Sequence, residues 1–174
     1  MNSELPKVDI TYGTKKKGDR LYSRALAFFA SLGKTQSHSL KVTKIGGDVF
    51  ISNAVKTNNR VGVLVFSDRR MLIGEVATME TIERRDLPII DTKTPYFDKN
   101  SLPKPKTFNL ILNKAHAVGK KVSVFLKSGE TYSGVSKYHD FDSVQLETQS
   151  GDIVIMYDAV KRVVPLESDG SLSE

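Results

Sequence analysis

The strongest constraint on the fold is a series of short apolar segments in the last third of this 174-residue chain. Between residues 122 and 165, the segments VSVFL, SVQLE, IVIMY and VKRVVP are rich in valine, isoleucine and leucine. Ser128-Gly129 and Ser150-Gly151 separate them, and such pairs favour tight turns. Short strands that must each bury an apolar face usually close into a small barrel or sandwich. Together with the segment TYSGV, which follows Ser128-Gly129, the four segments predict five short strands here.

Two helices are expected besides the strands. Residues 21–32 place apolar side chains at helical spacing and end before Gly33, a natural stop. A second stripe follows from Phe108 to Val118. The chain as a whole is therefore predicted to be mainly β with short helices.

The order of these patterns predicts five regions. A second set of short apolar segments follows the first helix and indicates a β-meander, and four of the six prolines lie between the two halves. The predicted regions are a basic flexible arm at 1–20, a helix plus β-meander domain of α+β type at 21–87, a proline-rich connector at 88–106, a helix plus five-stranded domain at 107–167, and a disordered tail at 168–174.

Composition excludes several classes of protein. Hydrophobic residues make up 39% and charged residues 26%, the balance of a globular protein. The absence of cysteine removes disulfides and thiolate chemistry, and three scattered histidines offer little for zinc. No apolar run has the length of a membrane span, so we expect a cytoplasmic protein without a membrane partner. With no catalytic motif, we expect no enzyme and no cofactor.

The net charge of +6 is concentrated in the first half, where residues 1–100 hold 17 Lys and Arg against 11 Asp and Glu. Cationic side chains bind nucleic acid by releasing counterions, and equally they keep a protein soluble. Both interpretations stay open. The candidate phosphate contacts are Arg69, Arg70, Arg84 and Arg85 in the first half and Lys114, Lys120 and Lys121 in the second.

Six pieces of the second half are informative together, although none is diagnostic alone. They are LN at 112–113, VSVFLKSG at 122–129, Gly134, HD at 139–140, SVQLE at 143–147 and YDAVKRVVP at 157–165. In this order and spacing they resemble the bacterial Hfq family of Sm-like proteins. The resemblance implies a small five-stranded Sm-like barrel, made of an N-terminal helix and a strongly bent antiparallel sheet, with Gly134 at the bend of its second strand.

The resemblance implies an RNA-binding protein, acting as a post-transcriptional regulator or RNA chaperone. On the face that binds A-rich RNA in the family, Phe125 matches the stacking aromatic and Gly129 the following turn. Thr131 and Ser133 are polar where the family is polar. Stacking on an aromatic is tolerant of sequence, so Phe125 is the foremost predicted RNA contact.

The family's U-rich face is altered. Met156, Tyr157 and Asp158 stand where the family usually has Tyr-Lys-His, so the basic residues are absent. His139 replaces an aromatic at the rim. Asp142 matches the family's pocket phenylalanine, although a one-residue bulge would restore the adjacent Phe141. We therefore expect A-rich RNA in preference to U-rich RNA, while DNA stays an alternative because charge reads phosphate and not sugar.

Asp140 matches an aspartate of the family, and we expect it to act mainly as a turn-capping carboxylate. A second class of function is also open. The alternative to RNA binding is an oligomerisation scaffold that has lost RNA binding and displays its first half to protein partners.

Sm protomers pair the fourth strand of one subunit with the fifth of the next, so the resemblance implies a homo-oligomeric ring. The first half is either a second Sm-like unit or an unrelated α+β domain. Residues 61–76 resemble residues 122–135 loosely, with Gly74 opposite Gly134 after one insertion. One unit per chain implies a hexamer, and two units imply a trimer with a pseudo-sixfold ring.

Overall fold

A computed structural model describes residues 13–14, 22–90, 92–93 and 106–167. The predicted arm at 1–20 lies outside the described residues except for Gly13–Thr14, as do the tail at 168–174 and most of the connector. The described chain is mainly β, with antiparallel strands and two α-helices. Neither helix is long and apolar enough to cross a membrane.

The first half begins with helix α1 (Ser23–Thr35), which buries Ala25, Leu26, Phe29 and Leu32 along one side. The predicted stop at Gly33 is wrong, because the helix continues to Thr35 and ends at Gln36 in the left-handed conformation. Gly33 has a different role: a Cβ atom there would collide with the backbone carbonyl of Val55. The glycine lets the helix pack closely on the sheet.

Six strands and a 3-10 turn complete the first half. They are β2 (Ser39–Lys44), β3 (Val49–Ser52), β4 (Ala54–Asn58), β5 (Val63–Phe66), β6 (Arg70–Leu72), the 3-10 turn Ile73–Glu75 and β7 (Val76–Ile82). In the core between the helix and the strands, the ring of Phe66 packs edge-to-face on the rings of Phe29 and Phe50. The ring centroids are 4.8 Å and 5.1 Å apart, respectively.

The second half contains the predicted helix and five strands. They are α2 (Asn109–Ala117), β9 (Val122–Leu126), β10 (Thr131–His139), β11 (Ser143–Thr148), β12 (Gly151–Met156), the 3-10 turn Tyr157–Ala159 and β13 (Val160–Pro165). A short pair, β1 (Gly13–Thr14) with β8 (Lys106–Thr107), precedes α2. The five strands lie in the order β13-β9-β10-β11-β12.

The expectation of a closed barrel is not met. The outer strands of this group, β13 and β12, do not pair with each other, so the sheet of the second half is open. Gly134 lies where β10 leaves β9 and begins to pair with β11, and a Cβ atom there would collide with the carbonyl of Glu147. A glycine is required at this change of partner.

The strand registers of the two halves repeat. Val42 pairs with Phe50 and Met79, as Val124 pairs with Tyr132 and Val163. Register shifts also fall at equivalent places in the two halves. The pairing of β2 with β7 is shifted, as is the equivalent pairing of β9 with β13. The pairing of β4 with β5 is shifted, as is the equivalent pairing of β10 with β11. A 3-10 turn precedes the last strand in both halves. One order of elements therefore occurs twice.

The repeat follows a different alignment from the one expected. Residues 61–76 cover β5, β6 and the 3-10 turn. Residues 122–135 instead cover β9 and the first residues of β10. Gly134 pairs with Val122 and Ser52 pairs with Leu40, at the corresponding position of its own half. The counterpart of Gly134 is therefore Ser52 and not Gly74.

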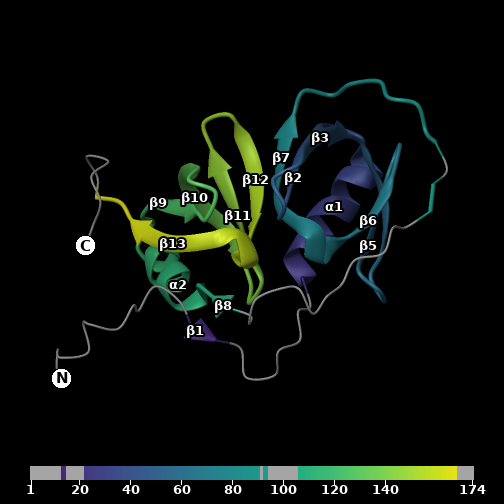
Figure 1. The fold of residues 1–174 in the computed structure, drawn as a ribbon. Helices are drawn as coiled ribbons and strands as arrows, with labels where there is room; N and C mark the ends of the chain where they lie inside the picture. Colours follow the sequence, from purple (N-terminus) through teal and green to yellow (C-terminus); the bar gives the residue numbers. More distant parts are fainter. Residues whose placement is uncertain (1–12, 15–21, 91, 94–105, 168–174) are drawn as a thin grey trace.

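The two halves share one sheet, because β12 pairs with β7 and links the strands into the order β13-β9-β10-β11-β12-β7-β2-β3 (Figure 1). Val154 lies opposite Met79 across this seam. Val154 and Met156 belong to the core cluster of the first half. The seam is therefore a packed interface.

Candidate nucleic-acid interface

The β9–β10 hairpin brings together the residues predicted for the A-rich face. Phe125 lies directly opposite Thr131, and Ser133 lies opposite Ser123, with their hydroxyl oxygens 2.6 Å apart. Gly129 forms the turn between the strands with a φ of +100°, a conformation that favours glycine. The four predicted residues therefore lie on one hairpin.

Phe125 faces away from the core of the second half. Alternate residues of β9, namely Val122, Val124 and Leu126, belong to the buried core cluster. Because successive side chains of a strand point to opposite faces, Phe125 lies on the outer face of the sheet, where it is half-buried. Its ring is therefore partly accessible for stacking.

Arg162 is a residue of this surface that sequence reasoning missed. It lies on β13 opposite Phe125, on the side away from Thr131, and is partly exposed. The outer face thus carries an aromatic ring between a hydroxyl and a guanidinium group, which suit stacking and phosphate contact. The alternation of β13 could have indicated Arg162, but only with the pairing of β13 and β9 known.

A pocket of about 340 Å³ lies between the two halves. The first half contributes the end of β2 and the turn into β3, and the second half contributes the β9–β10 turn and Asp158 with its neighbour Ala159. Its charged lining residues are Lys41, Lys44, Lys127, Glu130 and Asp158. Lys44 forms an ion pair of 3.3 Å with Glu75. Because the pocket needs both halves, neither sequence segment alone indicates it.

Two of the altered residues of the predicted U-rich face, Tyr157 and Asp158, lie in different environments. Tyr157 is only 1% exposed and packs edge-to-face on Phe108 at 5.2 Å, so its ring belongs to the core. Burial raises the pKa of Tyr157 well above its ordinary value, and the carboxylates of Asp140 and Asp142 raise it further. Asp158 lies half-buried in the 3-10 turn and lines the pocket between the halves.

Two carboxylates of the second half hold the start of α1. Asp142 accepts a hydrogen bond from the backbone N–H of Tyr22, and Asp140 accepts one from the N–H of Arg24, both at 2.8 Å. The first N–H groups of a helix lack partners within the helix, and negative charge is favourable there. Asp142 is therefore buried in the interface between the halves.

Asp140 also has the predicted turn-capping role. Its second carboxylate oxygen accepts hydrogen bonds from the backbone N–H groups of Asp142 and Ser143, both at 2.9 Å. That prediction is confirmed. The link to Arg24 was not predicted, because it depends on how the two halves pack.

His139 is part of a small polar cluster beside α2. Its ring nitrogens lie within hydrogen-bonding distance of Asn113 and Ser136, and its ring is 6.3 Å from that of His116. Burial lowers the pKa of His139, His116 lowers it further, and Asp140 opposes both effects. In the described part of the chain, no three acidic or histidine side chains are arranged to hold a metal ion.

The arginines predicted to contact phosphate differ in how far they are engaged within the protein. Arg69 donates two hydrogen bonds to Asp68, at 3.0 and 3.2 Å, and its guanidinium lies 3.9 Å over the ring of Phe50. Arg70 lines a pocket of the first half. Arg84 is partly buried, whereas Arg85 is exposed and its backbone N–H donates to Ser39.

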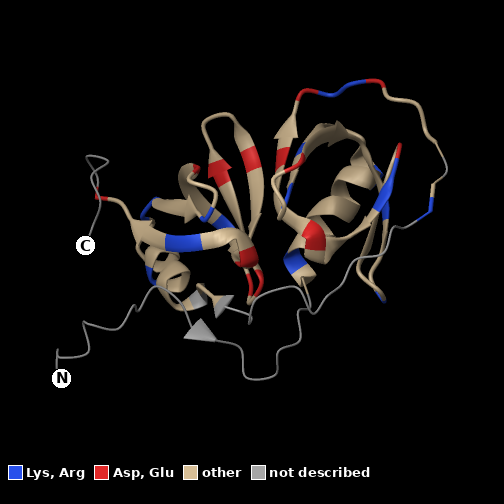
Figure 2. Cartoon of the chain, viewed as in Figure 1, with Lys and Arg blue, Asp and Glu red and all other residues tan. Residues whose placement is uncertain are grey.

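The predicted lysine rim is dispersed. Lys114 lies exposed on α2, Lys121 is exposed before β9, and Lys120 forms an ion pair of 3.6 Å with Glu167. Figure 2 shows basic and acidic positions interspersed over both halves. Basic and acidic positions are thus mixed along the described elements, and the lysine-rich part of the arm lies outside the described residues.

No family model matches the chain, and no curated protein matches it. Among solved structures, the chain is similar to a crystal structure of the pleiotropic translational regulator Hfq, with 25% sequence identity and a TM-score of 0.30. The similarity covers 32% of this chain and 92% of that chain. Because the TM-score is low, a function for this chain must be inferred from its own strand order and surface.

Proposed function

We propose that this chain is an RNA-binding protein of the Sm-like, Hfq-like type that works as a homo-oligomer in post-transcriptional regulation or as an RNA chaperone. The observation that carries the proposal is the outer face of β9, β10 and β13, where half-buried Phe125 lies between Thr131 and Arg162. The proposed activity is binding and not catalysis.

The chemistry of this face favours A-rich RNA. A base stacked on an aromatic ring contributes about 1 to 3 kcal/mol, and a guanidinium group binds phosphate through charge-assisted hydrogen bonds. The surface expected for U-rich RNA is weaker, because Tyr157 lies in the core and Asp142 holds the start of α1. In place of basic residues it contains carboxylates, which repel phosphate.

Fluorescence anisotropy with labelled A-rich and U-rich oligonucleotides at physiological salt tests the proposal. We expect the chain to bind A-rich RNA more tightly, and Phe125→Ala to weaken that binding. Phe141→Ala is the matched control, because Phe141 is 56% exposed but lies in the turn between β10 and β11. No binding to either RNA, or equal loss in both variants, would contradict the proposal.

One set of observations favours the alternative of an oligomerisation scaffold without RNA binding. Several basic side chains of the described surface lie against carboxylates, namely Lys44 with Glu75, Arg69 with Asp68 and Lys137 with Asp152. Such pairs leave less charge for phosphate. An oligomer that binds no RNA but retains protein partners would support this alternative.

A further inference from the structure

A pocket of about 330 Å³ in the first half collects positive charge from four separate segments. The segments are the end of β2, the turn between β5 and β6, strand β6 and the connector, and their cationic side chains are Lys44, Arg69, Arg70 and Lys93. Of the described residues that line the pocket, Asp68 alone is acidic. Because a concave surface with charge of one sign concentrates its counter-ions, this pocket attracts anions.

The guanidinium group of Arg69 is held in place on two sides. Its Nε and Nη2 donate to the carboxylate of Asp68 at 3.2 and 3.0 Å, and that carboxylate also accepts a hydrogen bond of 2.7 Å from Ser52. The ring of Phe50 lies 3.9 Å below the guanidinium. Among these contacts Nη1 is not used. A guanidinium that is already oriented loses little freedom on binding an oxyanion, so Arg69 is prepared to donate from Nη1.

The connector is fixed against the same pocket by its backbone. The N–H of Ile90 donates a hydrogen bond of 2.5 Å to the carbonyl of Ser67 in the turn between β5 and β6. Two and three residues later, Thr92 and Lys93 line the pocket. Lys93 is exposed, and no described residue forms an ion pair with it. Its ammonium group is therefore available to an anion.

Thr92 adds a hydroxyl group to this lining. In the described structure its hydroxyl oxygen is buried without a hydrogen-bond partner. A buried hydroxyl without a partner is unfavourable, and no hydrogen bond holds the side chain in this rotamer. Rotation about χ1 can present the hydroxyl to the pocket, where an oxyanion would accept its hydrogen bond. Thr92 thus indicates an oxygen-rich ligand independently of the charges.

The carboxylates near the pocket do not neutralise it. Lys44 forms an ion pair of 3.3 Å with Glu75, and Arg69 forms one of 3.0 Å with Asp68. Counting both carboxylates against the four cations leaves a surplus of two positive charges. A phosphate monoester has a charge of about −1.5 to −2 near pH 7 and carries three strong acceptor oxygens. The charge of the pocket therefore suits a single phosphate group.

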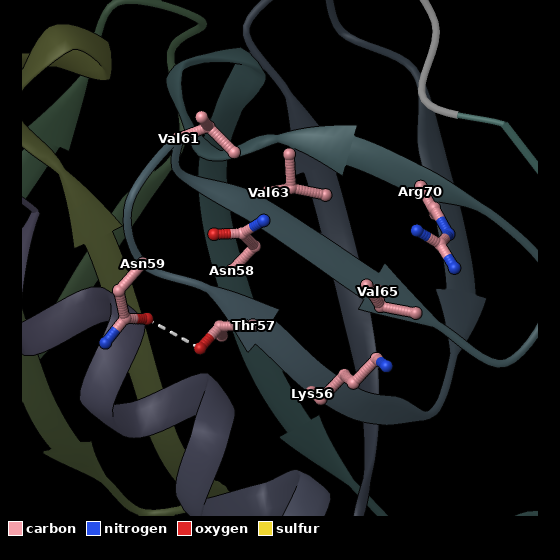
Figure 3. A pocket seen from close by; sticks show the side chains of 8 residues that line it. All are labelled: Lys56, Thr57, Asn58, Asn59, Val61, Val63, Val65 and Arg70. Atoms are coloured by element: carbon pink, nitrogen blue, oxygen red, sulfur yellow. Dashed lines mark hydrogen bonds between the residues drawn. The ribbon is translucent and has the colours of Figure 1, made fainter.

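A larger neighbouring pocket of about 670 Å³, over β4, β5 and β6, is less suited to an anion (Figure 3). Of its described lining residues, Lys56 and Arg70 carry charge, and both lie at one end. The rest of the lining consists of valines and neutral polar side chains. The smaller pocket has the higher concentration of cationic groups, and three of its four cations are not shared with the larger one.

We propose that the pocket lined by Lys44, Arg69 and Lys93 binds a phosphate group, which accepts hydrogen bonds from the guanidinium and ammonium groups and from the hydroxyl of Thr92. Free phosphate and the backbone of an RNA strand are the two sources of this ligand. The site is separate from the proposed RNA surface, because Phe125 does not line it. It therefore goes beyond the proposed function and does not require it.

The first experiment titrates the full chain with inorganic phosphate and follows the NMR signals of the Arg69 side chain and the Lys93 amide. Sodium chloride keeps the ionic strength constant. We expect saturable shifts of both signals with phosphate. Signals that do not move, or that move equally with chloride, would overturn the inference.

Variants of the connector test whether the effect is local. Lys93→Gln should weaken phosphate binding by about two- to fivefold, the range of an exposed ion pair. Lys34→Gln is the matched control, because Lys34 is exposed on α1, makes the same change of charge and does not line the pocket. Its affinity for phosphate should match that of the wild-type chain. Equal weakening in both variants would reduce the effect to net charge and overturn the inference.

Thr92→Val tests the hydroxyl with little change of shape. Since this hydroxyl has no partner in the described structure, the variant should unfold at the same or a higher denaturant concentration in phosphate-free buffer. Its affinity for phosphate should fall. Lower stability without phosphate, together with unchanged affinity, would show that the hydroxyl serves the fold and not the ligand.

The source of the phosphate is found by titrating A-rich RNA with the wild-type chain and Lys93→Gln over a range of salt. If the RNA backbone fills the pocket, Lys93→Gln weakens RNA binding and reduces the salt slope by about one. If free phosphate fills it, RNA binding is unchanged while phosphate affinity still falls; either result supports the site. A chain that binds inorganic phosphate but no RNA would contradict the proposed function and leave this inference intact.

Discussion

The two halves have the same order of elements and the same register shifts, yet they present different surfaces. Phe125 of the second half lies between Thr131 and Arg162, whereas its counterpart Thr43 lies between Val49 and Thr78. The β11–β12 surface is covered by the first half, while the corresponding β5–β6 surface lines a pocket in the described part of the chain. One order of elements therefore supports a proposed RNA surface in one half and a pocket of different lining in the other.

The largest expected effect comes from the position that is buried in one half and partly exposed in the other. Val154→Asp places an unpaired carboxylate in the packed seam, where Val154 is 1% exposed, and should lower the free energy of unfolding by several kcal/mol. Arg70→Asp, at the half-buried counterpart position, should cost less, because its carboxylate can stay partly hydrated. Chemical denaturation under monomeric conditions compares them, and equal losses would break the comparison.

The next largest effect is expected on the affinity for A-rich RNA. Phe125→Ala should weaken binding of A-rich RNA by about 1 to 3 kcal/mol, roughly 5- to 150-fold, because a stacking ring is lost. Thr43→Ala at the counterpart position should change affinity much less. Anisotropy titration of both variants measures the difference. If Thr43→Ala lost as much affinity as Phe125→Ala, the two halves would have to be regarded as equal RNA surfaces.

An effect of similar size, on stability and not on RNA binding, is expected where the second half holds α1. Asp142→Ala removes the acceptor for the Tyr22 N–H and should cost about 1 to 3 kcal/mol of unfolding free energy, as for a buried donor left without a partner. Lys137→Ala is a control that removes a partly exposed ion pair with Asp152, for which about 0 to 1 kcal/mol is expected. Urea denaturation of the two variants should rank them in this order.

The smallest expected effect is a pH dependence confined to the second half. The pKa of His139 lies below its ordinary value of 6.5, chiefly through burial, so the folded chain binds this proton less readily than the unfolded chain. This contribution to stability is complete above pH 6.5 and decreases as the pH falls below it. His139→Gln should flatten that part of the stability profile. An unchanged slope in His139→Gln would assign the pH dependence to other groups.

Local patterns predicted much of the second half. Apolar alternation and turn residues located all five strands, the helical stripe located α2, and the hairpin residues Phe125 and Thr131 lie opposite each other. The turn-capping role of Asp140 was also predicted, because its partners are two and three residues away. These features depend on neighbours in the chain, which the sequence displays directly.

Other features depend on residues far apart in the sequence. Asp142 binds the N–H of Tyr22 across 120 positions, and Arg162 reaches Phe125 only because β13 pairs with β9. The loose alignment of residues 61–76 with residues 122–135 was wrong, since similar apolar spacing occurs in strands of different position. Spacing alone does not specify which strands pair.

The sequence by itself determined where the strands, helices and turns lie, and which side chains alternate toward the core, because these follow from local backbone preference and periodic burial. Only the tertiary structure decided that β12 pairs with β7 and that β12 and β13 of the second half do not pair with each other. The reason is physical: hydrogen bonding between strands is nearly independent of side-chain identity, so strand pairing is selected by the packing of the whole molecule.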